Sequence, residues 1–359
     1  MVMRMIFERC GQNPLIIPEM VRPWLPGYRV ECTMNAGVAC YGPETLLLLR
    51  VAEKPPQAEP GYLNVPFLNC SRNPPQVEIR TLDMADPRYD FSDPRKVYDR
   101  EAGNYVYLTS ISHLRLARSR DGIHFSVDSQ PFIMPDCAAE SFGTEDSRIT
   151  QIGEDYWINY TAVSPDGITT AIATTRDFLQ IRKHGVAFVT ENRDVTIFPE
   201  RICGRYYALV RPVPKQIGQA KIWVTESDDL LHWGHYEPLR LPIFPWNDGK
   251  TGGGAVPIRT GEGWLILYHG ADRRTNRYCM GAALLDPVCP ARILAVTENP
   301  VLEPLEAYEQ AGFYPNVVFS CGAVTRGDTV YMYYGAADRV VGLAFAEIST
   351  LLGAMTRIS

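Results

Sequence analysis

Three charged residues stand together in the segment FGTEDSRIT at residues 142–150: Glu145, Asp146 and Arg148. They lead into a run that is typical of a β-strand. Successive side chains of a strand point to opposite faces, so one of the two adjacent carboxylates should face inward. We expect Asp146 and Arg148 to share that inner face and Glu145 to point away from it. The alternative is a turn with ordinary surface acids, because charged residues are mostly exposed.

Polar residues recur beside other runs that are rich in β-branched and aromatic residues. They would meet in one pocket if the strands that carry them surrounded a common centre. Several are basic although the chain has a net charge of −6, which suggests an anion-binding site. The further candidates are Asn35, Arg50, Arg193, Asp194, Glu200, Arg211, Lys250, His269, Tyr278, Asn316 and Asp338.

Each candidate also has an ordinary structural explanation. His269 could be a hydrogen-bonded core histidine, and Arg211, which precedes a proline, could lie at the surface. The segment KTGGG at 250–254 resembles a phosphate cradle but lacks the spacing of a P-loop. Six histidines without metal-ligand spacing argue against a metal site.

Charge and composition exclude several classes of protein. A negative net charge argues against a nucleic-acid surface. Nine cysteines without a CxxC pair are typical of reduced thiols. The N-terminus lacks the pattern of a signal peptide, and no apolar stretch is long enough to span a membrane. We therefore expect a cytoplasmic protein that binds neither nucleic acid nor membrane.

Short strand-like runs separated by Gly, Asp, Asn and Pro indicate an all-β fold. Five segments at intervals of roughly 50 to 60 residues pair a small-residue strand with a polar turn, which is typical of β-propeller blades. Three are followed by similar outer segments, QPFIMP, EPLRLP and NPVLEP, and the last unit lacks one. The N-terminal segment NPLIIP, residues 13–18, supplies a match. We therefore predict that residues 1–359 form a single five-bladed β-propeller whose N-terminal strand closes the last blade; a pair of β-sandwiches is the alternative.

The combination of motifs resembles the mannoside phosphorylases of glycoside hydrolase family 130. The resemblance spans about residues 13–350 and includes GTEDSRIT, ENRDVTIFPERICGRYYALVRP, KTGGGAVPI, GWLILYHG, YEQAGFYPNVVFSCGAV and VYMYYGAAD, in this order. It implies a five-bladed propeller that cleaves β-mannosides with phosphate and releases α-mannose 1-phosphate. A minority of the family are hydrolases.

The resemblance also implies roles for individual residues. Asp146 matches the single catalytic acid, whose proton reaches the glycosidic oxygen through a hydroxyl of the bound mannose. The phosphate site is implied at Arg193, Arg211, Lys250 and His269, and we expect Arg148 to serve it as well. Substrate contacts are expected at Asn35, Arg50, Glu145, Asp194, Tyr278, Asn316 and Asp338.

A phosphorylase needs an acid but no general base, because phosphate is already an anionic nucleophile that cations can hold. A second carboxylate at that spot would repel phosphate, so the basic set favours phosphorolysis over hydrolysis. We expect conversion of β-1,2-mannobiose and phosphate to α-D-mannose 1-phosphate and mannose, with phosphate as a co-substrate and no cofactor or metal. The alternatives are a hydrolase that uses a further carboxylate such as Glu200, a phosphorylase of β-1,4-mannosides or β-1,2-oligomannan, and a non-catalytic sugar-binding propeller.

Residues 55–95 are rich in Pro and Asn and are predicted to form a long loop over the active-site funnel. Such a loop would set the specificity for the leaving sugar. Family habit makes a homodimer plausible.

Overall fold

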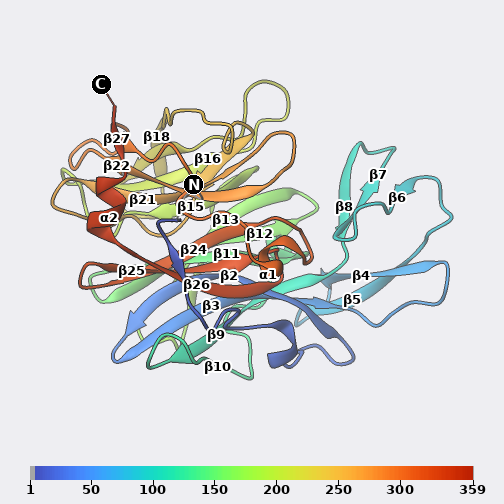
Figure 1. The fold of residues 1–359 in the computed structure, drawn as a ribbon. Helices are drawn as coiled ribbons and strands as arrows, with labels where there is room; N and C mark the ends of the chain where they lie inside the picture. The colour runs from blue at the N-terminus through green and yellow to red at the C-terminus, as the bar shows by residue number, and fades with distance from the viewer. Residues whose placement is uncertain (1–4, 359) are drawn as a thin grey trace.

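The computed structural model describes residues 5–358, which are built mainly from β-strands arranged as antiparallel meanders (Figure 1). The predicted all-β class is confirmed. Apolar side chains of neighbouring strands pack into several buried clusters, such as the one that contains Leu48, Leu116 and Ile158. Among the described residues, no helix has the length and apolar character needed to cross a membrane.

Two meanders share the largest sheet and meet through one parallel contact, between Gly143 and Ser112. The first contains β2 (Arg29–Tyr41), β3 (Glu44–Lys54), β9 (Ile111–Ser119) and β10 (Ser126–Val127). The second contains β11 (Gly143–Ile152), β12 (Asp155–Ser164), β13 (Gly167–Thr175) and β14 (Arg182–Phe188).

Three further sheets complete the body of the protein. One contains β15 (Asn192–Ile197), β16 (Tyr206–Pro212), β17 (Trp223–Ser227) and β18 (Trp233–Pro238). The next contains β19 (Lys250–Gly253), β20 (Ile258–Arg259), β21 (Trp264–Ala271), β22 (Tyr278–Leu285), β23 (Ile293–Val296) and β27 (Thr356–Arg357). The last contains β24 (Val318–Arg326), β25 (Thr329–Ala336), β26 (Val340–Glu347) and β1 (Glu8–Arg9). The helices are short: α1 (Ala307–Gln310), α2 (Ile348–Gly353) and the 3-10 turns η1 (Pro18–Met20) and η2 (Ala138–Glu140).

The five repeats found in the sequence correspond to β9, β13, β17, β22 and β26. In the first four, an aspartate caps the following turn: its carboxylate accepts the backbone N–H groups two and three residues later. This arrangement explains the repeated polar turn, because it satisfies backbone donors where the strand ends. The four aspartates are Asp121, Asp177, Asp229 and Asp286.

The N-terminal segment runs along the last meander. Arg9 in β1 opposes Ala344 of β26, and Ile16 forms an isolated bridge with Val341. The same kind of bridge joins QPFIMP to β9 and NPVLEP to β22, through Ile133 and Leu302. The segment NPLIIP therefore lies against β26 as the outer segments lie against their own strands, although the ladder pairs of β1 fall earlier than predicted, at residues 8 and 9.

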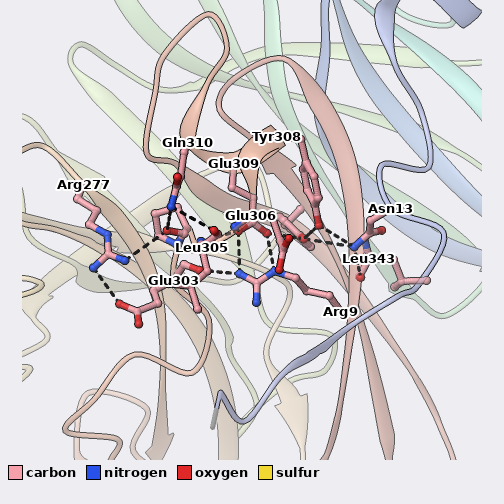
Figure 2. Close-up of polar contacts among 12 residues, drawn as sticks. Arg9, Asn13, Arg277, Glu303, Leu305, Glu306, Tyr308, Glu309, Gln310 and Leu343 are labelled. Carbon is pink, nitrogen blue, oxygen red and sulfur yellow. Dashed lines mark hydrogen bonds and ion pairs between the residues drawn. The ribbon is translucent and has the colours of Figure 1, made fainter. Parts of the chain in front are cut away.

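A buried ion pair fixes this N-terminal segment, as Figure 2 shows. The Arg9 guanidinium donates from Nε and Nη2 to the two carboxylate oxygens of Glu309, at 2.7 Å each. Glu309 also accepts the Tyr334 hydroxyl at 2.8 Å and two backbone N–H groups at the start of α1. Removal of one partner from such a pair is costly, because it leaves the other charge buried and uncompensated.

The predicted long loop at 55–95 is instead largely structured, and in this respect the prediction was wrong. It contains β4 (Tyr62–Asn69), β5 (Gln76–Asp83) and β6 (Tyr89–Asp90), and it leads into β7 (Lys96–Asp99) and β8 (Asn104–Leu108). Val65, Leu82 and Val97 give the two small sheets a core of their own. Residues 62–108, called the arm below, lie to one side of the body in Figure 1.

Candidate active site

One pocket of about 500 Å³ gathers all but three of the candidate residues; Arg148, Glu200 and Asn316 lie outside it. This volume is in the range of small-molecule sites. The predicted residues that line it are Asn35, Arg50, Glu145, Asp146, Arg193, Asp194, Arg211, Lys250, His269, Tyr278 and Asp338.

β-Bulges bring three of these side chains into the pocket. The pairing of β2, β11 and β15 with the next strand shifts in register, and each shift contains one residue with left-handed backbone: Asn35, Asp146 and Asp194, with φ of 48°, 46° and 54°. Asn and Asp adopt this conformation more readily than other residues with a Cβ. A bulge redirects the side chains around it, so three strands present a polar group to the same space.

The bulge in β11 overturns the predicted division between Glu145 and Asp146. Both carboxylates pair with Arg50, which lies 2.6 Å from Glu145 Oε1 and 3.2 Å from Asp146 Oδ1. Asn35 Nδ2 also donates to Asp146 Oδ1, at 3.0 Å. Glu145 therefore does not point away, because strict alternation holds only in an unbroken ladder. Burial raises the pKa of Glu145, against the opposing effect of Arg50.

Arg148 does not reach the pocket, which contradicts its predicted role in phosphate binding. Its side chain is 1% exposed and donates to the carbonyl oxygens of Asp146, Gly253 and Gly254. It also lies 3.4 Å from Asp194. Arg148 instead ties β11 to the neighbouring β19 sheet.

A buried carboxylate lies among the basic residues, contrary to the expectation that this spot would have none. Asp194 Oδ2 is 3.0 Å from Arg211 Nε and 3.7 Å from His269 Nε2. Burial alone would raise the pKa of Asp194, but the neighbouring arginines, Arg211 first and then Arg148, lower it to about 2. Asp194 is thus an ionised partner of the basic residues; it also lines the pocket, and its predicted sugar contact stays a prediction.

His269 is enclosed and neutral. It is 1% exposed, and burial lowers its pKa to about 3. Neither ring nitrogen has a hydrogen-bond partner among the described residues. The glycines of KTGGG permit this packing: a Cβ at Gly252 would lie 2.3 Å from His269 Cε1 and 2.5 Å from Asp194 Oδ2. The glycine run thus serves close packing, and does not form a P-loop.

The remaining basic residues face the same space. Arg193 opposes Arg211 across β15 and β16. Lys250 Nζ lies 4.6 Å from the centre of the Tyr278 ring, which stacks on His269. Burial, with Arg211 and Arg193 nearby, lowers the pKa of Lys250 to about 8.

Asp338 lies on the Arg50 side of the pocket. It has left-handed backbone, with φ of 50°, and burial raises its pKa to about 6, against the effect of Arg50. Asn316 is exposed and does not line the pocket, so its position does not support the predicted sugar contact. Its backbone carbonyl accepts the Tyr278 N–H at 3.1 Å. Glu200 is also remote: its side chain is 58% exposed and lies 3.9 Å from Arg259.

Several residues that line the pocket were not predicted from the sequence. Arg95 and Lys96 come from the arm, Glu191 precedes β15, and Tyr314 and Phe319 follow α1. The basic pair in SDPRKVYD was a visible signal, but it lay in the segment interpreted as a loop.

One other group of potential metal ligands, Asp136, Cys137 and Glu140, lies away from this pocket. Lys183 Nζ is 2.9 Å from Asp136 and 2.7 Å from Glu140, so one ammonium group already pairs with both carboxylates.

Comparison with known proteins finds close relatives. Residues 86–357 match glycoside hydrolase family 130, described as beta-1,4-mannooligosaccharide phosphorylase. A beta-1,2-mannobiose phosphorylase of Listeria innocua serovar 6a is 47% identical over 347 residues, 96% of this chain and 97% of the relative. A 1,2-beta-oligomannan phosphorylase of a Thermoanaerobacter species is 38% identical over 249 residues, 68% of this chain and 82% of the relative. The solved complex of the Listeria innocua enzyme with beta-1,2-mannobiose has a TM-score of 0.93 and 46% identity, and covers 98% of this chain and 99% of that one.

Proposed function

Since the chain belongs to glycoside hydrolase family 130, we propose that it is a phosphorylase that converts β-1,2-mannobiose and inorganic phosphate to α-D-mannose 1-phosphate and mannose. Its close relatives act on β-1,2-linked mannosides. Phosphate is a co-substrate in this proposal, and no cofactor is required.

The observation that carries the proposal is the separation of charge within the pocket. On one side, Asp146 is held by Asn35 and Arg50. On the other side, Arg193, Arg211 and Lys250 surround a space next to the unpartnered nitrogens of His269. Arginine offers a planar fork to phosphate oxygens, and lysine offers a compact charge. The arrangement suits a dianion on one side of a sugar and an acid on the other.

The proposed reaction is a single displacement with inversion. A phosphate oxygen attacks the anomeric carbon while the bond from that carbon to the glycosidic oxygen breaks. The proton of Asp146 passes to the leaving oxygen, through a mannose hydroxyl as the family resemblance implies. The cations hold the phosphate in line for attack. The two reactants are therefore already positioned in one complex, and the reaction does not depend on a chance encounter in solution.

The charge of Asp194 argues against hydrolysis. An inverting hydrolase needs a carboxylate that takes a proton from water. A pKa of about 2 makes Asp194 a weak base at neutral pH, and its carboxylate is engaged by Arg211. Glu200, the carboxylate that the hydrolase alternative would use, lies outside the pocket.

The wider architecture is part of the same proposal. We propose that the meanders form five blades around the pocket, with β1 and the segment after it completing the last blade. The pairing of β1 with β26 and the division of the large sheet into two meanders support this arrangement. A cytoplasmic location and a homodimeric assembly are further proposals, based on the sequence and on family habit.

The test is to incubate β-1,2-mannobiose with and without phosphate and to follow the products by ³¹P and ¹H NMR. We expect α-mannose 1-phosphate only when phosphate is present. In Asp146→Asn, turnover should fall by about a hundredfold or more, whereas Glu200→Gln should retain it. Free mannose alone, formed without phosphate, would identify a hydrolase; binding without turnover would identify a sugar-binding protein.

A further inference from the structure

The arm contributes a charged group to the pocket that the proposed displacement has not used. Arg95 stands just before β7 and lines the same pocket as Asp146. Its backbone carbonyl accepts the Thr109 N–H at 2.9 Å, so the residue is fixed where the arm returns to the body. Figure 1 shows the arm beside the sheets that carry the site.

Two contacts hold the Arg95 side chain in one orientation. Asp93 accepts hydrogen bonds from Arg95 Nε at 3.0 Å and from Nη2 at 2.9 Å. The guanidinium carbon lies 4.4 Å from the centre of the Tyr314 ring. A guanidinium held on an aromatic face by a bidentate carboxylate has little freedom left to lose on binding a ligand.

One part of this guanidinium is left for a ligand. No partner is found for Arg95 Nη1 among residues 5–358, and the Arg95 side chain is 30% exposed. Arg50, Arg211 and His269 are more enclosed, at 17%, 8% and 1%. Arg95 thus lies nearer the mouth than the residues that surround the reacting groups.

The position of Arg95 indicates which part of the substrate it meets. Its charge lowers the pKa of Asp338, on the sugar side of the pocket, and also that of Lys250. In an in-line displacement the leaving group departs on the side opposite to the nucleophile. With phosphate on the more enclosed Arg211 beside His269, as proposed, the leaving sugar lies toward the mouth, where Tyr314 offers an aromatic ring and Arg95 offers N–H donors.

We propose that Arg95 is a specificity-determining residue that donates hydrogen bonds from Nη1 to hydroxyl groups of the leaving sugar, above the Tyr314 ring. This inference rests on the proposed phosphorolysis. It adds the residue through which the arm selects the sugar that is released in phosphorolysis and accepted in the reverse reaction. A free sugar hydroxyl is a neutral acceptor, so the interaction does not compete with the anion site.

The test uses Arg95→Ala and Arg95→Lys, with Arg100→Ala as the matched control. Arg100 is also on the arm, is 55% exposed and pairs with Asp90, but it does not line the pocket. Its loss therefore changes the net charge by the same amount as the loss of Arg95 without altering the lining of the pocket. In synthesis from α-mannose 1-phosphate and mannose, Arg95→Ala should raise the KM for mannose by about tenfold or more, and leave the KM for mannose 1-phosphate within about twofold. Arg95→Lys should not restore it, because the stacked planar fork is lost.

Two results would overturn the proposal. An unchanged KM for mannose would show that Arg95 does not contact the leaving sugar, and an equal rise in the KM for mannose 1-phosphate would assign Arg95 to the anion site. Thermal unfolding of both variants checks that the arm still folds.

Failure of the proposed function is a separate outcome. If the wild-type protein showed no phosphorolysis, calorimetric titration with β-1,2-mannobiose in the absence of phosphate would still compare Arg95→Ala with Arg100→Ala. Weaker binding by about tenfold in Arg95→Ala alone supports the sugar contact, and equal binding refutes it.

Discussion

The charge of Lys250 should determine the alkaline limit of phosphate use. Burial and the neighbouring arginines lower the pKa of Lys250 to about 8. Lysine is charged below its pKa and neutral above it, so about one-tenth of the free enzyme would carry this charge at one pH unit above the pKa. At saturating mannobiose, kcat/KM for phosphate reports the enzyme that holds mannobiose but no phosphate, and it should therefore fall about tenfold per pH unit above about pH 8.

The substitution Lys250→Arg tests the assignment. Arginine keeps its charge throughout this range, so the alkaline fall should disappear even if the absolute rate is lower. The assay measures initial rates of mannose 1-phosphate formation at saturating mannobiose and subsaturating phosphate, between about pH 7 and pH 10. At saturating phosphate the bound anion should stabilise the charged lysine and move the fall to higher pH. Identical profiles for the two proteins would refute the assignment.

Three other substitutions test how the site and its support are held. Asp194→Asn leaves buried arginines without their counter-ion and should lower the free energy of unfolding by about 3 kcal/mol, measured by urea denaturation; an unchanged midpoint would contradict the pairing. Gly252→Ala would press a methyl group against His269 and should raise the KM for phosphate, whereas Gly261→Ala, with open space around its Cβ, should not. Glu309→Gln breaks the buried pair of the N-terminal segment and should cost about 3 kcal/mol of stability; a loss below 1 kcal/mol, roughly that of an exposed pair, would argue against its role.

The repeats could be predicted because their cause is local. A strand followed by an aspartate that caps its own turn needs only adjacent residues, as at Asp121 and Asp229. The outer segments could also be recognised from adjacent residues. The segment NPLIIP was matched to the last unit, and its Ile16 does form a bridge with Val341 of β26. Most of the pocket was predicted from the motifs, among which Asn35, Asp146, Asp194 and Lys250 lie in the first strand of their meanders.

What could not be predicted depends on contacts between distant parts of the chain. Alternation separated Glu145 from Asp146, whereas the bulge in β11 brings both to Arg50. The burial of Arg148 depends on carbonyl groups more than a hundred residues away. Arg95 was missed because its place in the pocket depends on how the arm folds, which no local pattern reveals.

The carboxylate at the phosphate side contradicts the simple rule that such a site should contain only cations, and its surroundings explain why. Arg211, Arg193 and Lys250 would repel one another in an empty, partly desolvated pocket. Asp194 offsets part of that charge and pairs with the Arg211 guanidinium, in the proposed function before phosphate binds. The geometry is then formed in advance, so binding energy need not be spent on ordering the cations. Asp194 also binds Arg148, which joins β11, the strand of the acid, to the β19 strand of Lys250. The same carboxylate therefore links the side of the pocket that holds Asp146 to the proposed phosphate side, which gives a physical reason for an anion in the proposed anion-binding site.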